Sequence, residues 1–229
     1  YMVSGDAIIQ DRIFEKTIFN DKHPTRDPVT GRTLSPMPFY GFEIDYEAQD
    51  LTTIPLPELN LSRVFVLSTG DTCSASEAFI NGLRGIDVEV ILIGDQTCGK
   101  PYGFYPTDNC GTTYFTIQFS GANAKDFGEY ADGFFPTPNP IFAADVPGCQ
   151  VADDFSAQLG DPNERMLASA LYYAANDSCP VAVAGQSLSH HQRVSNDSGL
   201  SIQRHDPRMQ AFILENKLNQ PIKPAQDPQ

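Results

Sequence analysis

The sequence contains no hydrophobic run long enough to cross a membrane. The longest candidate, VEVILIG at 88–94, is far shorter than the roughly 18 apolar residues that a spanning helix needs. Basic residues are also scarce, since 15 Lys and Arg stand against 29 Asp and Glu, for a formal net charge of −14. Such a surface repels phosphate backbones, so we expect no nucleic-acid partner.

Cysteine is present, but in no pattern typical of a metal site. The five cysteines have spacings that match no known set of metal ligands, and we expect neither a metal nor another cofactor. Cys98 with Cys110, and Cys149 with Cys179, would each close a short loop and leave Cys73 unpaired. Two such bridges would suit an oxidising compartment, whereas five free thiols in a cytosolic protein would fit the count equally well.

Composition predicts a globular chain with one well-buried domain. Hydrophobic residues make up 41% of the 229 positions and charged residues 19%, which is typical of such domains. We expect one domain over 1–180, in which 1–60 is an irregular entry rich in proline and turns and 61–180 holds the core and its C-terminal helix. Residues 181–229 form a polar, linker-like tail with a possible short helix at 207–218. Because Tyr1 precedes Met2, we expect a cut or processed chain.

Hydrophobic patterning predicts an α/β fold. The segment 61–70 has the pattern of a buried strand, 74–85 that of a helix ending at a glycine, and 88–94 that of a second buried strand. Strand, helix and strand at this spacing predict a βαβ unit with parallel strands. Further strands are expected at 11–19 and 111–121, and an amphipathic helix at 162–175. The turn-rich loop at 20–42 is either a flap over a substrate or a surface excursion.

The stretch SASE at 74–77 has two interpretations. It is a capping box, in which Ser74 caps the helix and Glu77 binds back to the free N–H of Ser74. It also stands where a strand turns into a helix, so that Ser74 could be a nucleophile with the N–H of Ala75 facing a developing oxyanion. A serine nucleophile needs a base to remove its proton.

Lys100 is the best candidate for that base. The four histidines lie in the turn-rich loop or in the polar tail, where a catalytic group would lack a packed scaffold. Lys100 follows the second predicted strand as Ser74 follows the first, so both fall at the carboxyl edge of the sheet, where active sites of parallel sheets gather. The alternative is a surface lysine in a glycine turn.

The residues VFVLSTGDTCSASEAFINGL and VILIGDQTCGKPYGF together resemble the carboxyl-terminal processing, or tail-specific, serine peptidases. The resemblance is strongest over about 60–135, where it is similar to a bacterial envelope branch of that family. It implies Ser74 as nucleophile, Lys100 as general base and the Ala75 amide as one oxyanion donor. Glu77 is assigned to the helix cap that positions Ser74.

The resemblance further implies a β/α core like that of Clp-type proteases and crotonases, protein or peptide substrates, and a periplasmic or cell-envelope location. The chain departs from the family in three respects. The peptide-binding PDZ module and the upstream glycine-rich stretch that supplies a second oxyanion donor are absent, and Phe104 stands where many members have a glutamine that orients the lysine. The sequence therefore predicts a catalytic core truncated at its N-terminus, weak or inactive as an isolated chain.

Two other functions fit parts of the sequence. A non-catalytic binding or scaffold domain of the same fold would explain Phe104 and the missing upstream segments. A cysteine hydrolase using Cys73 or Cys98 lacks a well-placed histidine, and we expect Cys73 to be a small packed residue beside Ser74.

Overall fold

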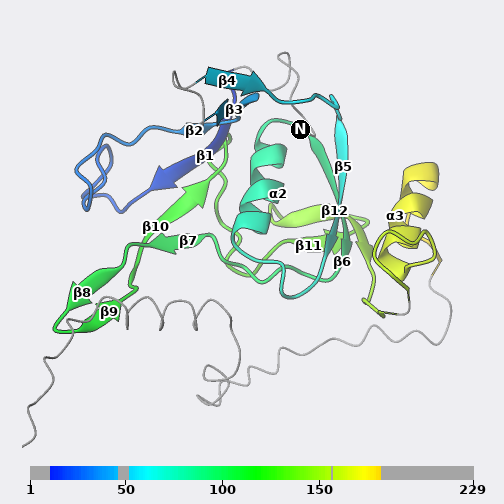
Figure 1. Ribbon diagram of the computed structural model, residues 1–229. Coiled ribbons are helices and arrows are strands. Elements are labelled where there is room, and N and C mark those ends of the chain that lie inside the picture. The colour runs from blue at the N-terminus through cyan, green and yellow to red at the C-terminus, as the bar shows by residue number, and fades with distance from the viewer. Residues whose placement is uncertain (1–10, 46–51, 156, 182–229) are drawn as a thin grey trace, which may run out of the picture. The chain divides into compact units, whose positions relative to one another are not determined.

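The computed structural model describes residues 11–45, 52–155 and 157–181, all within one compact unit of the chain. This part of the protein is a mixed α/β fold with two four-stranded sheets and the helices α2 and α3 (Figure 1). Neither of these helices is long and apolar enough to cross a membrane. The expected helix at 207–218, and the tail from residue 182 onward, lie outside the described residues.

A parallel sheet forms the centre of the unit. Helix α2 connects the strands that the sequence predicted at 61–70 and 88–94. These two strands pair in parallel, from Arg63 opposite Glu89 to Ser68 opposite Gly94. The predicted βαβ unit is therefore confirmed. In order across the sheet, the strands are β11 (Phe135–Thr137), β12 (Asp145–Gln150), β6 (Glu89–Gly94) and β5 (Arg63–Ser68), with α2 spanning Ala75–Gly85.

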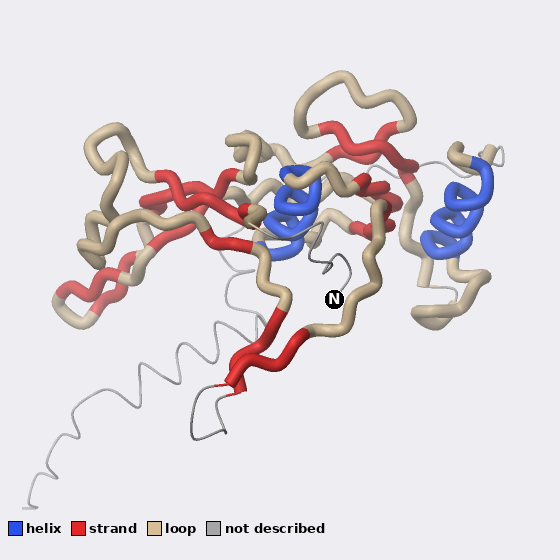
Figure 2. The backbone as a smooth tube through the Cα atoms, turned by 90° about the horizontal axis from the view of Figure 1, so that it is seen from above, coloured by secondary structure: helices blue, strands red, loops and turns tan. Residues whose placement is uncertain are grey.

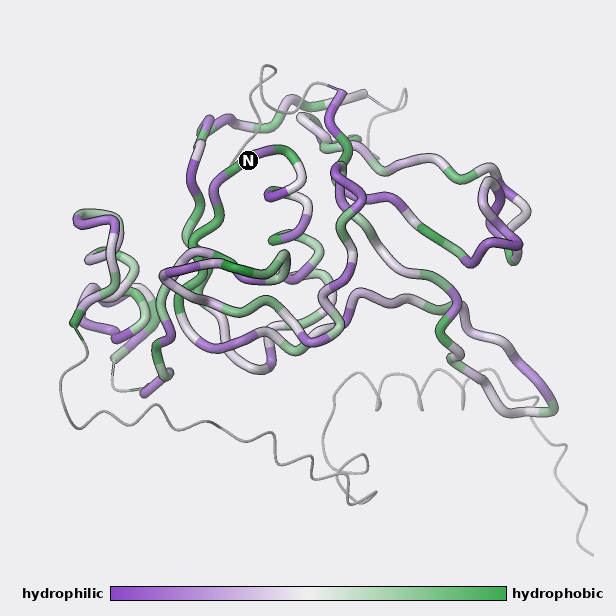
Figure 3. Tube along the Cα trace, turned by 180° about the vertical axis from the view of Figure 1, so that it is seen from behind, coloured by the Kyte–Doolittle hydropathy of each residue, from purple (hydrophilic) through white to green (hydrophobic). Residues whose placement is uncertain are grey.

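Strand β6 is buried on both faces, as expected for a central parallel strand. Val90 and Leu92 pack in a hydrophobic cluster with Ile80 and Leu83 of α2. Ile91 and Ile93 point to the opposite face and pack in a second cluster with Met166 and Ala170 of α3, Arg165–Asn176. The alternation of side chains thus places one helix on each face of the sheet. Figure 3 shows the hydrophobic residues along these strands.

A second, antiparallel sheet covers the other side of α2. This helix contacts β1 and β10 as well as β6, so that it lies between the two sheets (Figures 1 and 2). The second sheet has the order β2 (Met37–Pro38), β1 (Ile13–Ile18), β10 (Ile117–Ala122) and β7 (Tyr102–Phe104). Two separate hairpins pair β3 (Phe42–Asp45) with β4 (Thr52–Pro55), and β8 (Thr107–Asn109) with β9 (Thr112–Tyr114).

The structure corrects several element boundaries. The strand expected at 111–121 is two strands, because β9 turns back on β8 whereas β10 pairs with β1 and β7. Helix α3 begins later than expected, at Arg165, because the Glu164 side chain caps its first turn. Strands β11 and β12 were not predicted, since FPT and DVPGCQ contain proline or glycine and no clear alternation.

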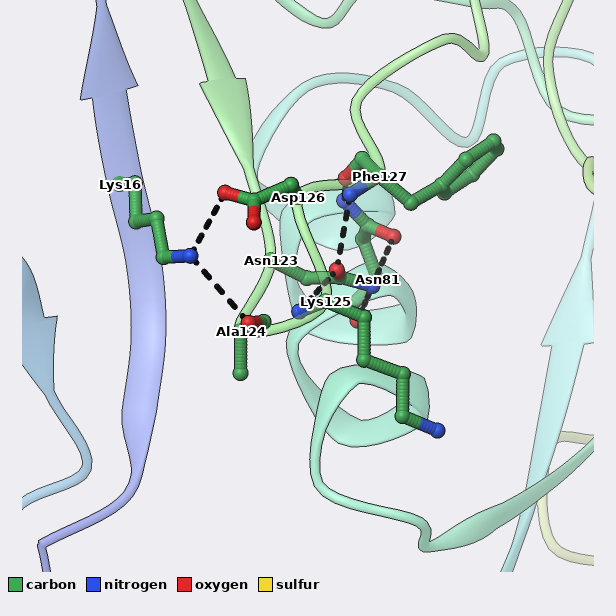
Figure 4. A network of polar contacts seen from close by, with 7 residues as sticks. All are labelled: Lys16, Asn81, Asn123, Ala124, Lys125, Asp126 and Phe127. Carbon is green, nitrogen blue, oxygen red and sulfur yellow. Dashed lines mark hydrogen bonds and ion pairs between the residues drawn. The ribbon is translucent and has the colours of Figure 1, made fainter.

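A network of amide side chains fixes α2 to the loop that follows β10 (Figure 4). Asn123 donates to the backbone oxygen of Asn81 at 3.0 Å and to its side-chain oxygen at 2.9 Å, while Asn81 donates to the backbone oxygen of Phe127 at 2.8 Å. From β1, Lys16 reaches the same loop through Asp126 at 2.6 Å and the Ala124 oxygen at 3.2 Å. Both asparagines are buried. The network therefore joins the second sheet to the helix.

We expect an Asn123→Ala variant to lower the free energy of unfolding by about 2 kcal/mol, because it leaves the side-chain oxygen of the buried Asn81 without its donor and two loop N–H groups without their acceptor. Urea denaturation measures the change. The control is Asn139→Ala at an exposed loop position, expected within about 0.5 kcal/mol of the wild type. Equal effects from the two variants would contradict the assigned role.

The turn-rich segment before β2 is anchored by Asp27. Its carboxylate accepts hydrogen bonds from the Tyr105 hydroxyl and from the N–H groups of Val29 and Thr30. Burial alone would raise the pKa of Asp27, but these hydrogen bonds outweigh it and lower the pKa to about 2. The ionised carboxylate is thus the form that holds the loop on the second sheet.

Because the folded-state pKa of Asp27 is below its ordinary value of 3.8, its contribution to stability is present above about pH 4 and is lost as the pH falls toward 2. We expect Asp27→Asn to lower the melting temperature near pH 7, by an amount that shrinks below about pH 4. Thermal melts across this pH range measure the effect, with Asp21→Asn in the same loop as control. A difference independent of pH would contradict the role of the ionised carboxylate.

Candidate active site

Ser74 and Lys100 lie at the same edge of the parallel sheet. Each stands six residues beyond the end of its strand, Ser74 after β5 and Lys100 after β6. Both are exposed, and both line one pocket of about 330 Å³. The structure therefore brings the two residues to one pocket, where the parallel topology predicts them.

The backbone of Ser74 is in an unusual conformation. Its φ of 51° and ψ of −107° place a non-glycine residue in a region that L-residues rarely adopt. Such strain persists where the surroundings fix it, and it gathers at functional sites. A sharp, strained turn from strand to helix is the way in which α/β-hydrolases expose their nucleophilic serine. The next residue, Ala75, lines the pocket, and its N–H belongs to the first helical turn, where no acceptor exists within the helix.

The Glu77 carboxylate connects the Ser74 turn to the Lys100 loop. It is fully buried and accepts the N–H of Ser74 at 2.9 Å, which is the predicted capping contact. It also accepts the N–H groups of Gly99 at 2.6 Å and Lys100 at 2.7 Å, and the hydroxyl of Thr97 at 2.6 Å. One side chain thus fixes the backbone of both candidate residues.

The backbone around Gly99 explains why a glycine precedes Lys100. Its φ is 80°, and a Cβ at this position would collide with the backbone oxygen of Ala131. The loop that carries Lys100 therefore packs directly against the segment around residue 131. Any larger residue at 99 would displace Lys100 from the pocket edge.

The walls of the pocket are largely apolar and come from the second sheet. Phe14, Met37 and Phe119 line it together with Tyr130. Tyr130 is buried and stacks on Phe134 with a centroid distance of 4.7 Å, and burial raises the pKa of its hydroxyl, with the nearby charges of Glu15 and Glu77 adding to the effect. Met37 belongs to the segment 20–42, for which the sequence allowed either a flap over a substrate or a surface loop. This segment reaches the pocket through Met37.

Glu15 of β1 places a carboxyl group in the same pocket. Burial raises its pKa, and its side chain lies where a Cβ on Gly121 would stand. A second pocket of about 460 Å³ adjoins the first through Tyr102, Gly121 and Tyr130, and it is also lined by Asp126, Glu129 and Asp132. A groove with apolar walls and acidic edges therefore extends away from Ser74.

Several residues of the site were not predicted. Thr97, Glu15 and Met37 carry no local signal, because only the pairing of distant segments brings them to Ser74. Phe104, at the position where many tail-specific peptidases have a glutamine, packs against Phe115 and is absent from the lining of the Ser74 pocket. Among the described residues, no hydrogen bond joins the Ser74 and Lys100 side chains. Catalytic hydrogen bonds are often long in free enzymes and tighten when substrate binds.

The disulfides differ in part from the expected pairing. Cys149–Cys179 is present as predicted, but the partner of Cys98 is Cys73 rather than Cys110. Cys110 is a free, exposed thiol at the tip of the β8–β9 hairpin, whereas Cys73 and Cys98 follow two adjacent parallel strands. Cys73 is thus not merely a packed residue, and neither it nor Cys98 has a free thiol to serve as a nucleophile.

Metal ligands do not cluster in the described ranges: no group of three or more His, Cys, Asp or Glu side chains there could hold an ion. His23 lies in the loop before β2 and does not line the Ser74 pocket. The other histidines lie outside the described residues.

The fold is similar to a solved structure named as a putative S41 protease from Bacteroides fragilis. The TM-score is 0.52 at 22% sequence identity, over 77% of this chain and 40% of the other. The chain therefore spans less than half the length of that protein. No family model matches the sequence, and no curated protein matches it. The likeness shows a mixed α/β fold of the kind found in that protease.

Proposed function

We propose that this chain is the catalytic core of a serine endopeptidase with Ser74 and Lys100 as its dyad. The observation that carries the proposal is the strained backbone of Ser74 at the mouth of a pocket that Lys100 shares. Glu77 also supports the proposal. A glutamate that only capped the helix would bind the N–H of Ser74, whereas this buried carboxylate binds the N–H of Lys100 as well and so fixes both backbones. The likeness to the Bacteroides fragilis structure agrees with a peptidase.

The proposed reaction begins when the free amine of Lys100 accepts the hydroxyl proton of Ser74. The Ser74 oxygen attacks the scissile carbonyl, and the N–H of Ala75 stabilises the resulting oxyanion. Lys100 then gives its proton to the leaving amine, and the C–N bond breaks. Lys100 next activates a water molecule, which hydrolyses the acyl-enzyme and restores Ser74.

The substrates we infer are unstructured protein segments, including apolar C-terminal tails. The pocket walls are apolar, and a folded domain would not fit into the pocket. This is the activity of the tail-specific peptidases, whose Clp- and crotonase-like core we infer for this chain. The two disulfides favour an extracytoplasmic location such as the periplasm.

A Ser74→Ala variant tests the proposal. We expect cleavage of an unstructured peptide by the full-length protein to fall by at least about 10³-fold, because the nucleophile is lost. The matched control is Ser76→Ala, an exposed serine in the same helical turn, which should keep wild-type cleavage. Undiminished turnover by Ser74→Ala would remove that residue from the mechanism.

A non-catalytic peptide-binding domain is the second candidate. The observation that favours it is the lack of a hydrogen bond between the Ser74 and Lys100 side chains within the described residues, together with Phe104 at the orienting position. Such a domain would bind peptide in the Ser74 pocket without cleaving it. Equal peptide affinity of the wild type and Ser74→Ala, with no cleavage by either, would support this candidate.

A further inference from the structure

The Cys73–Cys98 disulfide joins the two segments that carry the residues of the proposed dyad. Cys73 directly precedes Ser74, and Cys98 is two residues before Lys100. The bridge joins two segments whose Cα atoms at these cysteines are 5.2 Å apart, beyond the ends of two parallel strands. One of the two segments carries Ser74, the proposed nucleophile, and the other carries Lys100, the proposed base.

Hydrogen bonds also join these two segments. Cys98 donates its N–H to the backbone oxygen of Thr72 at 3.0 Å, and the Glu77 carboxylate accepts N–H groups from both sides. Ser74 itself is exposed and holds a strained φ of 51°. A strained, exposed turn keeps its conformation only while its surroundings fix it.

The second disulfide, Cys149–Cys179, lies in a different environment from Cys73–Cys98. Cys149 of β12 is buried in the hydrophobic cluster beneath α3, and its partner Cys179 follows that helix. None of these four cysteines lines the Ser74 pocket, but only Cys73 and Cys98 lie within two residues of Ser74 and Lys100, which do. Cys73, Cys98 and Cys179 are half-buried and Cys149 is buried, so a small dithiol has access to both disulfides, and the effect of each bridge has to be separated by substitution.

We propose that Cys73 and Cys98 are positioning residues of the Ser74–Lys100 dyad, and that their disulfide makes the peptidase sensitive to thiol reductants. This inference rests on the proposed function. With the bridge intact, the Ser74 turn and the Lys100 loop have a fixed separation. Without it, the two segments are held by non-covalent contacts, and a displacement of about 1 Å is enough to cost about 10²-fold in rate.

The redox step is an ordinary thiol–disulfide exchange with an added dithiol such as dithiothreitol. The dithiol supplies two electrons and two protons, the S–S bond between Cys73 and Cys98 breaks, and two thiols form. The reductant closes to its own cyclic disulfide. An added disulfide oxidant reverses the exchange, so lost activity should return.

The test compares two double variants of the full-length protein, Cys73→Ala/Cys98→Ala and Cys149→Ala/Cys179→Ala. We expect the first to lower kcat at least about tenfold with KM within about twofold, since positioning acts on the chemical step. We expect the second to lower the melting temperature while leaving kcat unchanged. Brief treatment of the wild type with dithiothreitol should reproduce the first result, which covers the case in which a variant does not fold.

Amide hydrogen exchange provides a readout that does not need catalysis. Loss of the Cys73–Cys98 bridge should speed exchange in residues 72–77 and 97–101 and leave strand β12 unchanged. If the peptidase proposal itself fails, so that Ser74→Ala has no effect on turnover, this exchange pattern still measures the positioning. Unchanged kcat together with unchanged exchange in both segments would overturn the inference.

Discussion

A Lys100→Met variant is expected to lose about 10³-fold in kcat while keeping its fold, because methionine retains most of the apolar stem but provides no amine to accept the Ser74 proton. Lys100 forms no ion pair among the described residues, and only its backbone N–H is bound by Glu77. Its side chain is therefore free for chemistry, and its removal leaves no buried partner unsatisfied. Steady-state cleavage of an unstructured peptide measures the loss.

The pH dependence of the same reaction separates a base from a binding group. A general base accepts a proton only as the free amine, so kcat/KM of the wild type should rise toward alkaline pH, and the residual activity of Lys100→Met should lack that rise. Lys125→Met, which removes an exposed lysine paired with Asp87 away from the pocket, is the control and should retain both rate and profile. A wild-type pH profile in the Lys100 variant would exclude Lys100 as the base.

The second large effect is expected from Glu77→Gln. The amide replaces one carboxylate oxygen by an NH₂ group, which meets N–H donors that need an acceptor. Hydrogen bonds to a charged group contribute about 1.5–3 kcal/mol each, so the free energy of unfolding should fall by about 3 kcal/mol or more. Because the same contacts fix the Ser74 and Lys100 backbones, kcat should also fall by about 10²-fold with little change in KM.

Glu164 provides the matched control for that experiment. It too is a buried glutamate at a helix start, where its carboxylate accepts the N–H groups of Met166 and Leu167. Glu164→Gln should therefore lower the melting temperature but leave kcat unchanged in the protein that remains folded. If the two variants lose stability and activity in the same proportion, Glu77 has a structural role only.

The parts of the site that follow from backbone topology could be predicted from the sequence. Two buried strands around one helix imply a parallel pair, and residues just beyond their carboxyl ends must share an edge, which located Ser74 and Lys100. The helix cap at Glu77 was local and was also predictable. The hydrogen bonds of the same carboxylate to Gly99 and Lys100 could not be predicted, because they depend on how the loop after β6 folds back toward α2.

The disulfide error has the same physical origin. Short sequence separation suggested Cys98 with Cys110, but Cys110 lies at the exposed tip of a hairpin. Cys73 is 25 residues from Cys98 in sequence, and parallel pairing of β5 with β6 brings the two together. Proximity in a parallel sheet is set by strand order, which a count of intervening residues does not reveal.

The most direct test of the proposed dyad is to find which residue a serine-reactive phosphonate modifies. After the full-length protein has reacted with the probe, peptide mass mapping should place the adduct on Ser74, with none on Ser76, and the Lys100→Met variant should be labelled far more slowly. Peptide cleavage by a protein whose Ser74 stays unmodified while another residue carries the probe would contradict the Ser74–Lys100 dyad.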